Sequence, residues 1–198
     1  MIVHPHLTAV LTTLLDARRE MQQAVDRLDP SRGTMKPAPD RWCAAEVLEH
    51  LALAEGSFSG RVAAALEAAA LDTAALHIAG TNSVAAASTT DPAPLPEAVR
   101  TRLADRSNRR VAPERAQPAG NIDVAAAWTH VDAVEDRLRQ MLAGAATLPL
   151  HDIIVEHPTL GSFTVYQFVE LMAAHRRRHV AQLHEIADAV GGTTAPAR

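Results

Sequence analysis

Two histidines four residues apart, His175 and His179, are the pair in this sequence best placed to do chemistry. On a helix, side chains at positions i and i+4 lie one above the other on the same face. Their ring nitrogens can therefore converge on one cation, as in the H-x-x-x-H part of helical zinc sites. Both positions fall within the apolar stripe of their segment, so we expect both imidazoles to point inward. A shared metal ion is then the simplest partner for the two rings.

A third histidine, His50, is the candidate that completes the site, because it lies on another apolar stripe between Val47 and Ala54. Three neutral imidazoles from two helices leave one or more positions open for water, which is typical of catalytic rather than structural metal sites. Imidazole suits Zn, Ni, Fe or Cu, and the sequence does not choose among them. The expected cofactor is one divalent transition metal, with Zn, Ni or Fe as the candidates. The alternative is a core in which the three histidines only form hydrogen bonds. No HExxH motif is present, which excludes the usual metalloprotease mechanism.

Several residues around His50 are weaker candidates for a role in the site. We interpret Glu46 as a helix-capping residue, and Glu49 and Glu55 as solvated. The alternative is that one of these carboxylates accepts a hydrogen bond from an imidazole N–H. Trp42 is expected in the core at one end of the protein.

Other candidate groups are expected at the surface. His151 and His157 fall in a loop that could overhang the site, but we interpret them as surface residues. The three arginines at 176–178 are expected to point mostly away from the core. The segment 100–110 holds five arginines and is interpreted as a solvated face, with contact to an anionic substrate as the alternative. Cys43 has no histidine close in sequence, so a role as nucleophile is not favoured.

The composition limits the class of protein that could carry this site. Of 198 residues, 47% are hydrophobic and only 3% aromatic, and about a fifth are alanine, the strongest helix former. The formal net charge of −4 argues against a partner such as nucleic acid. A single cysteine excludes an internal disulfide. With no signal peptide and no run of about 18 apolar residues, we expect a cytoplasmic protein with no membrane partner.

Hydrophobic periodicity predicts four long helices that must position these side chains. Their expected ranges are 5–28, 44–71, 122–142 and 165–190. We therefore expect an all-α protein, a four-helix bundle with a long connection between helices two and three. Residues 1–192 are predicted to form one domain, and residues 193–198 a disordered tail.

The segments between the predicted helices carry fewer signals. The connection 72–120 has irregular, Pro-rich composition, with a short solvated helix expected after Pro96. The loop 151–163 is expected to hold a short extended piece at 152–155. Thr164 and Gln167 have the spacing of a capping box at the start of the last helix.

Three segments of the chain resemble a known family. The segment 41–51 (RWCAAEVLEHL) is similar to the opening of helix two in the DinB-like superfamily, where a tryptophan, a helix cap and a downstream histidine recur. The segments 157–164 (HPTLGSFT) and 175–183 (HRRRHVAQL) resemble the end of the DinB_2 type. The sequence departs from the family at Cys43-Ala44, which replaces the usual Ser/Thr-Pro. This departure affects the expected start of the helix and not the metal.

The resemblance implies a four-helix bundle, frequent homodimers and a divalent metal on three histidines, which correspond here to His50, His175 and His179. Members of known activity are mainly thiol-dependent transferases that use bacillithiol, mycothiol or glutathione, together with a related isomerase. A divalent ion lowers the pKa of a bound thiol or water, so that a nucleophile exists near neutral pH. The prediction is a thiol-dependent S-transferase or a metal-dependent hydrolase for a small electrophile, with a low-molecular-weight thiol as cosubstrate. The alternative is a non-catalytic metal-binding stress-response protein.

Overall fold

The computed structural model describes residues 5–78, 92–107 and 110–191, and the chain in these ranges is mostly helical (68%). The described part contains five α-helices and one small two-stranded sheet. The all-α class expected from the sequence therefore broadly fits. The fifth helix is the short one expected after Pro96, whereas the sheet is an addition. The predicted tail at 193–198 lies outside the described residues.

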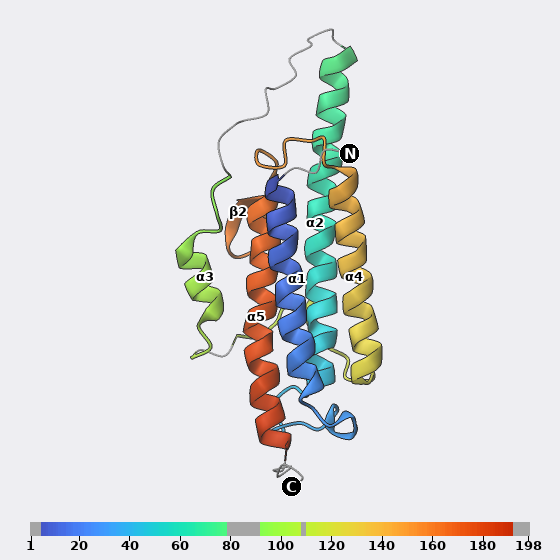
Figure 1. Ribbon diagram of the computed structural model, residues 1–198, viewed down its shortest axis with the longest axis vertical. Coiled ribbons are helices and arrows are strands. Elements are labelled where there is room, and N and C mark those ends of the chain that lie inside the picture. Colours follow the sequence, from blue (N-terminus) through green and yellow to red (C-terminus); the bar gives the residue numbers. More distant parts are fainter. Residues whose placement is uncertain (1–4, 79–91, 108–109, 192–198) are drawn as a thin grey trace.

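Four long helices lie side by side along the long axis of the molecule (Figure 1). Helix α1 packs against α5, and α2 packs against α4. The bounds of these helices are α1 Pro5–Asp26, α2 Ala44–Ile78, α4 Val124–Gly144 and α5 Val165–Val190. Helix α5 has the predicted range, and the ends of α1 and α4 lie within two residues of the predicted ones. Helix α2 continues to Ile78 instead of ending at residue 71, because the alanine-rich sequence that follows Leu71 still favours a helix.

Side chains close the N-terminal ends of the helices that carry the histidines. At α5, the capping box predicted for Thr164 and Gln167 is formed in both directions, which confirms that prediction. At α2, the backbone N–H of Cys43 donates to Glu46 Oε2 at 2.8 Å, so the glutamate half of a capping box is present without a Ser or Thr cap. Glu46 also pairs with Lys36 at 2.8 Å.

The connection between α2 and α4 is described before and after residues 108–109, and hydrogen bonds attach it to the long helices. It contains α3 (Glu97–Ala104) and the short 3₁₀ helix η2 (Glu114–Ala116). The carboxylate of Glu49 on α2 accepts hydrogen bonds from the backbone N–H groups of Ala119 and Gly120, both at 3.0 Å. Gly120 has φ +71°, and a Cβ there would lie 2.9 Å from Glu46 Oε1, so this turn requires glycine.

A β-hairpin precedes α5, and the sequence predicted only part of its first strand. Strand β1 (Ile154–His157) pairs antiparallel with β2 (Gly161–Thr164), with Val155 opposite Phe163. The expected extended piece at 152–155 overlaps β1, whereas β2 was predicted as loop. Val155 and Phe163 are both buried, so the hairpin covers one end of the core and holds the segment 157–160 near the last helix.

A charged layer divides the apolar core into two clusters along the long axis. One cluster contains Leu14 and Phe168, and the other contains Met21 and Leu183. Between them lie the side chains of Arg18, Glu55, Asp132, Glu135 and Arg176, here called the polar layer. The predicted site residues His50, His175 and His179 lie beside this layer, where α5 meets α2. In the described part of the chain, no helix has both the length and the apolar character needed to cross a membrane.

Candidate metal centre

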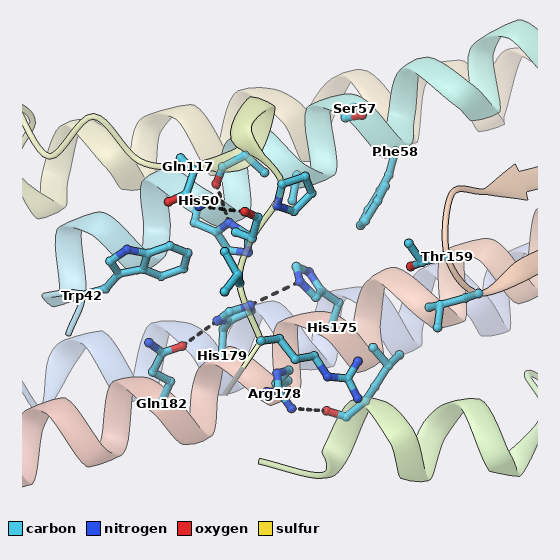
Figure 2. Close-up of a pocket in the computed structure, with 18 of the residues that line it drawn as sticks. Trp42, His50, Ser57, Phe58, Gln117, Thr159, His175, Arg178, His179 and Gln182 are labelled. Carbon is cyan, nitrogen blue, oxygen red and sulfur yellow. Dashed lines mark hydrogen bonds between the residues drawn. The ribbon is translucent and has the colours of Figure 1, made fainter. Parts of the chain in front are cut away.

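The three predicted histidines come together at one point between α2 and α5. His50 on α2 and His175 and His179 on α5 each offer a ring nitrogen, and these atoms all lie within 4.8 Å of one another. Figure 2 shows the three rings facing one another at the base of a pocket. The ring of His50 lies 5.6 Å from that of His175 and 5.0 Å from that of His179, between ring centroids. We call these three side chains the imidazole cluster.

The geometry of the imidazole cluster fits a divalent transition metal. The Nε2 atoms of His175 and His179 lie 3.3 Å apart. Two imidazole nitrogens bound to one tetrahedral ion at about 2.0–2.1 Å would themselves be about 3.3 Å apart. Both histidines use the i, i+4 spacing on α5, so the helix itself sets this separation.

Hydrogen bonds to the far ring nitrogens set the tautomers of two of the histidines. His50 Nδ1 lies 2.7 Å from the carbonyl oxygen of Ala116, and His179 Nδ1 lies 2.9 Å from Gln182 Oε1. Both partners are acceptors, so each Nδ1 carries the proton and each Nε2 presents a lone pair to the cluster. The glutamates near His50 do not take this role, contrary to the alternative raised from the sequence. His175 Nδ1 is buried and has no hydrogen-bond partner among the described residues.

Burial keeps the cluster neutral, which is the state that binds a metal. Burial lowers the pKa of His179 to about 3 and that of His175 well below its ordinary value, and the neighbouring imidazoles add to both shifts. The pKa of His50 is also lowered by burial, although its hydrogen bond to Ala116 partly opposes this. Neutral imidazole is the metal ligand, so little proton competition is expected near neutral pH.

A pocket of about 860 Å³ opens directly onto the imidazole cluster. Its walls come from α2, α3, α5, the hairpin and the segment around η2. Trp42 lies against His50 with ring centroids 4.8 Å apart, and Phe58 meets His175 edge-on at 5.9 Å. The cluster is therefore reachable by a small molecule, as a site with open coordination positions requires.

Comparison with known proteins places the chain in a family. The family model of the DinB superfamily matches residues 13–183, which is most of the chain. The chain belongs to the DinB superfamily. It is also 30% identical over 89 residues to the uncharacterized protein YuaE of Bacillus subtilis (strain 168), an alignment that covers 43% of this chain. The chain spans about half (53%) of the length of that relative, and no solved structure matches it significantly.

The pocket of this DinB-superfamily chain includes two residues that the sequence analysis did not assign to it. Trp42, predicted in the core, is half-buried, packs against the core cluster of Met21 and Leu183 and also forms part of the pocket wall. His157 was predicted at the surface, but it is half-buried, lines the pocket and lies 5.3 Å from Phe58 between ring centroids. His151 does not line this pocket. Cys43 is buried outside it, and burial raises the pKa of its thiol, which agrees with the prediction that it is not a nucleophile.

A hydrogen bond sets the tautomer of His157. The backbone N–H of Thr159 donates to His157 Nδ1 at 3.2 Å, so the ring proton resides on Nε2. Burial and the nearby arginines, of which Arg61 has the largest effect, lower the pKa of His157 to about 4. His157 is therefore a neutral hydrogen-bond donor near neutral pH.

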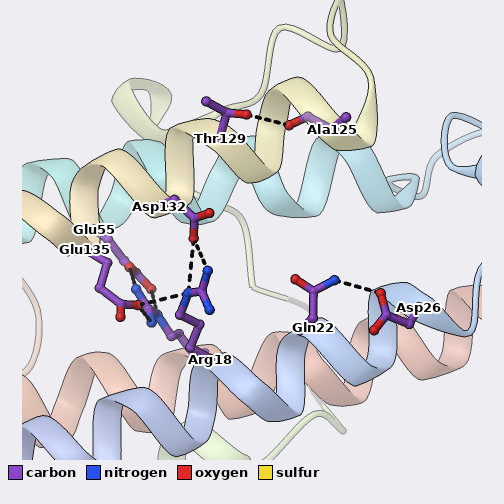
Figure 3. A network of polar contacts seen from close by, with 9 residues as sticks. Arg18, Gln22, Asp26, Glu55, Ala125, Thr129, Asp132 and Glu135 are labelled. Atoms are coloured by element: carbon purple, nitrogen blue, oxygen red, sulfur yellow. Dashed lines mark hydrogen bonds and ion pairs between the residues drawn. The ribbon is translucent and has the colours of Figure 1, made fainter.

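The polar layer holds two residues that were predicted to be solvated or to point away. Glu55 and Arg176 are both fully buried and form a bidentate pair, with Arg176 Nε to Glu55 Oε1 at 2.8 Å and Nη2 to Oε2 at 2.6 Å. Arg176 also donates to Glu135 on α4, while Arg18 on α1 donates to Asp132 at 2.6 Å (Figure 3). The prediction that Glu49 and Glu55 are solvated was wrong, because both side chains are buried and both carboxylates accept hydrogen bonds.

This charged network also positions the imidazole cluster of the DinB-superfamily chain. Arg176 follows His175 directly in α5, and its guanidinium bridges α5 to α2 and α4. Burial alone would lower the pKa of Arg176, but the two carboxylates raise it overall, so the group stays charged. The bidentate fork fixes the register of α5 against α2, and with it the distance between His50 and the other two histidines.

Acid should destabilise the metal-free protein between about pH 7 and pH 5. Unfolded histidines take up a proton near pH 6.5, whereas His179 and His157 stay neutral in the fold down to about pH 3 and pH 4. The unfolded state then binds more protons, so the free energy of unfolding falls as the pH falls. Thermal melts in chelator across this range measure the effect.

His179→Gln should flatten this pH dependence, and His130→Gln, at an exposed position on α4, should not. A melting temperature of the metal-free protein that is constant over this range would contradict the neutral cluster.

Proposed function

We propose that this DinB-superfamily protein is a four-helix bundle that holds one divalent transition metal on His50, His175 and His179. We further propose that it uses the metal in a reaction of a small electrophile with a thiol or with water. The observation that carries this proposal is the pair of Nε2 atoms 3.3 Å apart, next to the third imidazole at the base of an open pocket.

The chemistry supplied by the metal would be activation of the nucleophile. A divalent ion in this cluster would lower the pKa of a thiol or a water that it binds, so that the nucleophile forms near neutral pH. The residues of the chain do the rest. Gln182 and the carbonyl of Ala116 orient the rings of His179 and His50, which fixes the direction of their lone pairs.

The pocket walls would bind and orient the electrophile. Trp42 and Phe58 provide apolar surface on either side of the imidazole cluster and displace water from it. The Nε2–H of His157 is available to hydrogen-bond a substrate oxygen. A low-molecular-weight thiol as cosubstrate, a homodimeric assembly and a cytoplasmic location belong to the same proposal.

Replacement of the metal by Co(II) provides a direct test of thiol activation. We expect the Co(II) protein to gain a sulfur-to-cobalt charge-transfer band when glutathione is added. The zinc protein should then accelerate the reaction of glutathione with 1-chloro-2,4-dinitrobenzene. With water as nucleophile, the same protein should instead hydrolyse 4-nitrophenyl acetate. His175→Ala should lose the band and both rates.

The outcomes separate the functions. A charge-transfer band with thiol consumption supports the transferase, and ester hydrolysis without the band supports the hydrolase. Stoichiometric metal binding with neither activity would contradict both the transferase and the hydrolase. It would favour the alternative, a non-catalytic metal-binding stress-response protein.

A further inference from the structure

Arginines gather around the pocket although the chain as a whole is acidic. The formal net charge of the protein is −4. Among the described residues, in contrast, the pocket is lined by five arginines (Arg41, Arg106, Arg110, Arg115 and Arg178) and by one carboxylate, that of Glu185. Glu185 is already paired with Arg106 through both of its oxygens. The remaining four arginines have no carboxylate within 4.0 Å among the described residues.

Of the pocket arginines, Arg178 is nearest in sequence to the imidazole cluster, and some of its N–H groups form no hydrogen bond to the described residues. It precedes His179 on α5, and Figure 2 shows it beside the cluster. Its Nη1 donates to the carbonyl oxygens of Leu103 (2.9 Å) and Asp105, which ties α3 to α5. Its Nε and Nη2 form no hydrogen bond to the described residues. Neither nitrogen is among the buried side-chain atoms that lack a hydrogen-bond partner. Two parallel N–H groups of a guanidinium are the usual partners of a carboxylate or phosphate.

The charges around the pocket act together as a positive field. Arg106, Arg110, Arg115 and Arg178 all line the pocket. The pKa of His157, on the opposite wall, is lowered by burial and then by arginines that include Arg115. Positive charge from several arginines thus reaches His157, and an anion entering the pocket would neutralise part of it.

Apolar side chains occupy the rest of the wall. Trp42, Phe58, Leu103 and Leu160 all line the pocket. We propose that the pocket takes a small ligand with an apolar body and one anionic group, a carboxylate or a phosphate. Arg178, Arg110 and Arg115 bind the anionic group, while the apolar body lies against Trp42 and Phe58. This inference rests on the proposed function, because it names the substrate class of the same pocket.

Binding of simple anions to the full chain tests the inference. Calorimetric titrations use benzoate and phenyl phosphate as probes, with neutral benzamide for comparison, on the zinc-loaded and the chelator-treated protein. The two anions distinguish a carboxylate ligand from a phosphate ligand. Both forms of the protein should bind at least one anion more tightly than benzamide. Binding that requires zinc would place the anion on the metal and overturn the proposal.

Three variants locate the anionic group. Arg178→Gln should weaken anion binding roughly tenfold, the cost of one charge-assisted hydrogen bond, because glutamine can still donate to the carbonyls that Nη1 contacts. The double variant Arg110→Gln/Arg115→Gln should weaken it several-fold. The control Arg137→Gln/Arg139→Gln removes two exposed arginines from α4, outside the pocket, and should change it less than about twofold.

The result is separable from the metal proposal. Loss of anion binding in the pocket variants with zinc still bound in full supports the anion site. Anion binding that equals the control in both pocket variants overturns it. Failure of the wild-type protein to bind zinc, with arginine-dependent anion binding intact, would contradict the proposed function alone.

Discussion

Replacing Arg176 with methionine should lower the free energy of unfolding by about 3–5 kcal/mol. Arg176 and Glu55 are completely buried, and Glu135 is nearly so. Removing the guanidinium leaves two carboxylates in the core, with Arg18 Nε 3.9 Å from Glu135 as the nearest remaining cation. Buried charge without a partner is far costlier than the loss of a surface ion pair. Chemical denaturation monitored by circular dichroism measures the effect.

The neighbouring arginine provides a matched control. Arg177 pairs with Glu20 at 3.0 Å on the surface, so Arg177→Met should cost about 1 kcal/mol or less. The triple variant Arg176→Met/Glu55→Leu/Glu135→Leu removes the charges together and should recover most of the lost stability. If Arg176→Met and Arg177→Met are equally stable, the polar layer does not hold the helices together.

Replacing His175 or His179 with alanine should abolish stoichiometric metal binding while the helices persist. Each imidazole supplies one of three ligands, and two ligands hold a divalent ion too weakly to survive dialysis. Gln182→Leu removes only the acceptor that orients His179, so it should weaken metal affinity by about 10–100-fold. Metal content by elemental analysis and helicity by circular dichroism are measured on each variant.

His130→Ala is the control for these substitutions, because His130 is exposed on α4 and does not line the pocket. It should retain the full metal content. Full metal retention in both His175→Ala and His179→Ala would exclude the three-histidine site, whatever the helicity of the variants.

Much of the fold could be predicted because each long helix has its own apolar stripe. The stripe and the capping box of Thr164 predicted α5 with its observed bounds. Helix α2 was predicted too short, since Asp72 and Thr73 interrupt the stripe although the segment is exposed and needs none. Strand β2 was missed because four residues carry little periodicity, and the turn before it depends on Gly161 at φ +98°.

The imidazole cluster could also be predicted from the apolar stripes of the helices, whereas the residues that hydrogen-bond and position it could not. His50, His175 and His179 occupy stripe positions, where a polar residue signals a buried partner. The pairing of Arg176 with Glu55 joins residues 121 positions apart, and each reads as an ordinary charged helix residue in isolation. The acceptor for His50 is a backbone carbonyl, at Ala116, which no side-chain pattern reveals. Gln182 lies one turn after His179, and that spacing was the only available signal.

The metal centre itself can be tested by one measurement on the wild-type protein. The protein is purified with zinc, nickel and iron supplied. X-ray absorption at the edge of the metal that it retains reports the ligands, and the elemental analysis that identifies the metal gives the stoichiometry. The proposed site predicts one divalent ion per chain with three imidazole nitrogens at about 2.0–2.2 Å and an exchangeable water or thiol ligand beside them. A protein that retains no metal, or a metal whose shell lacks imidazole nitrogen, would contradict the account.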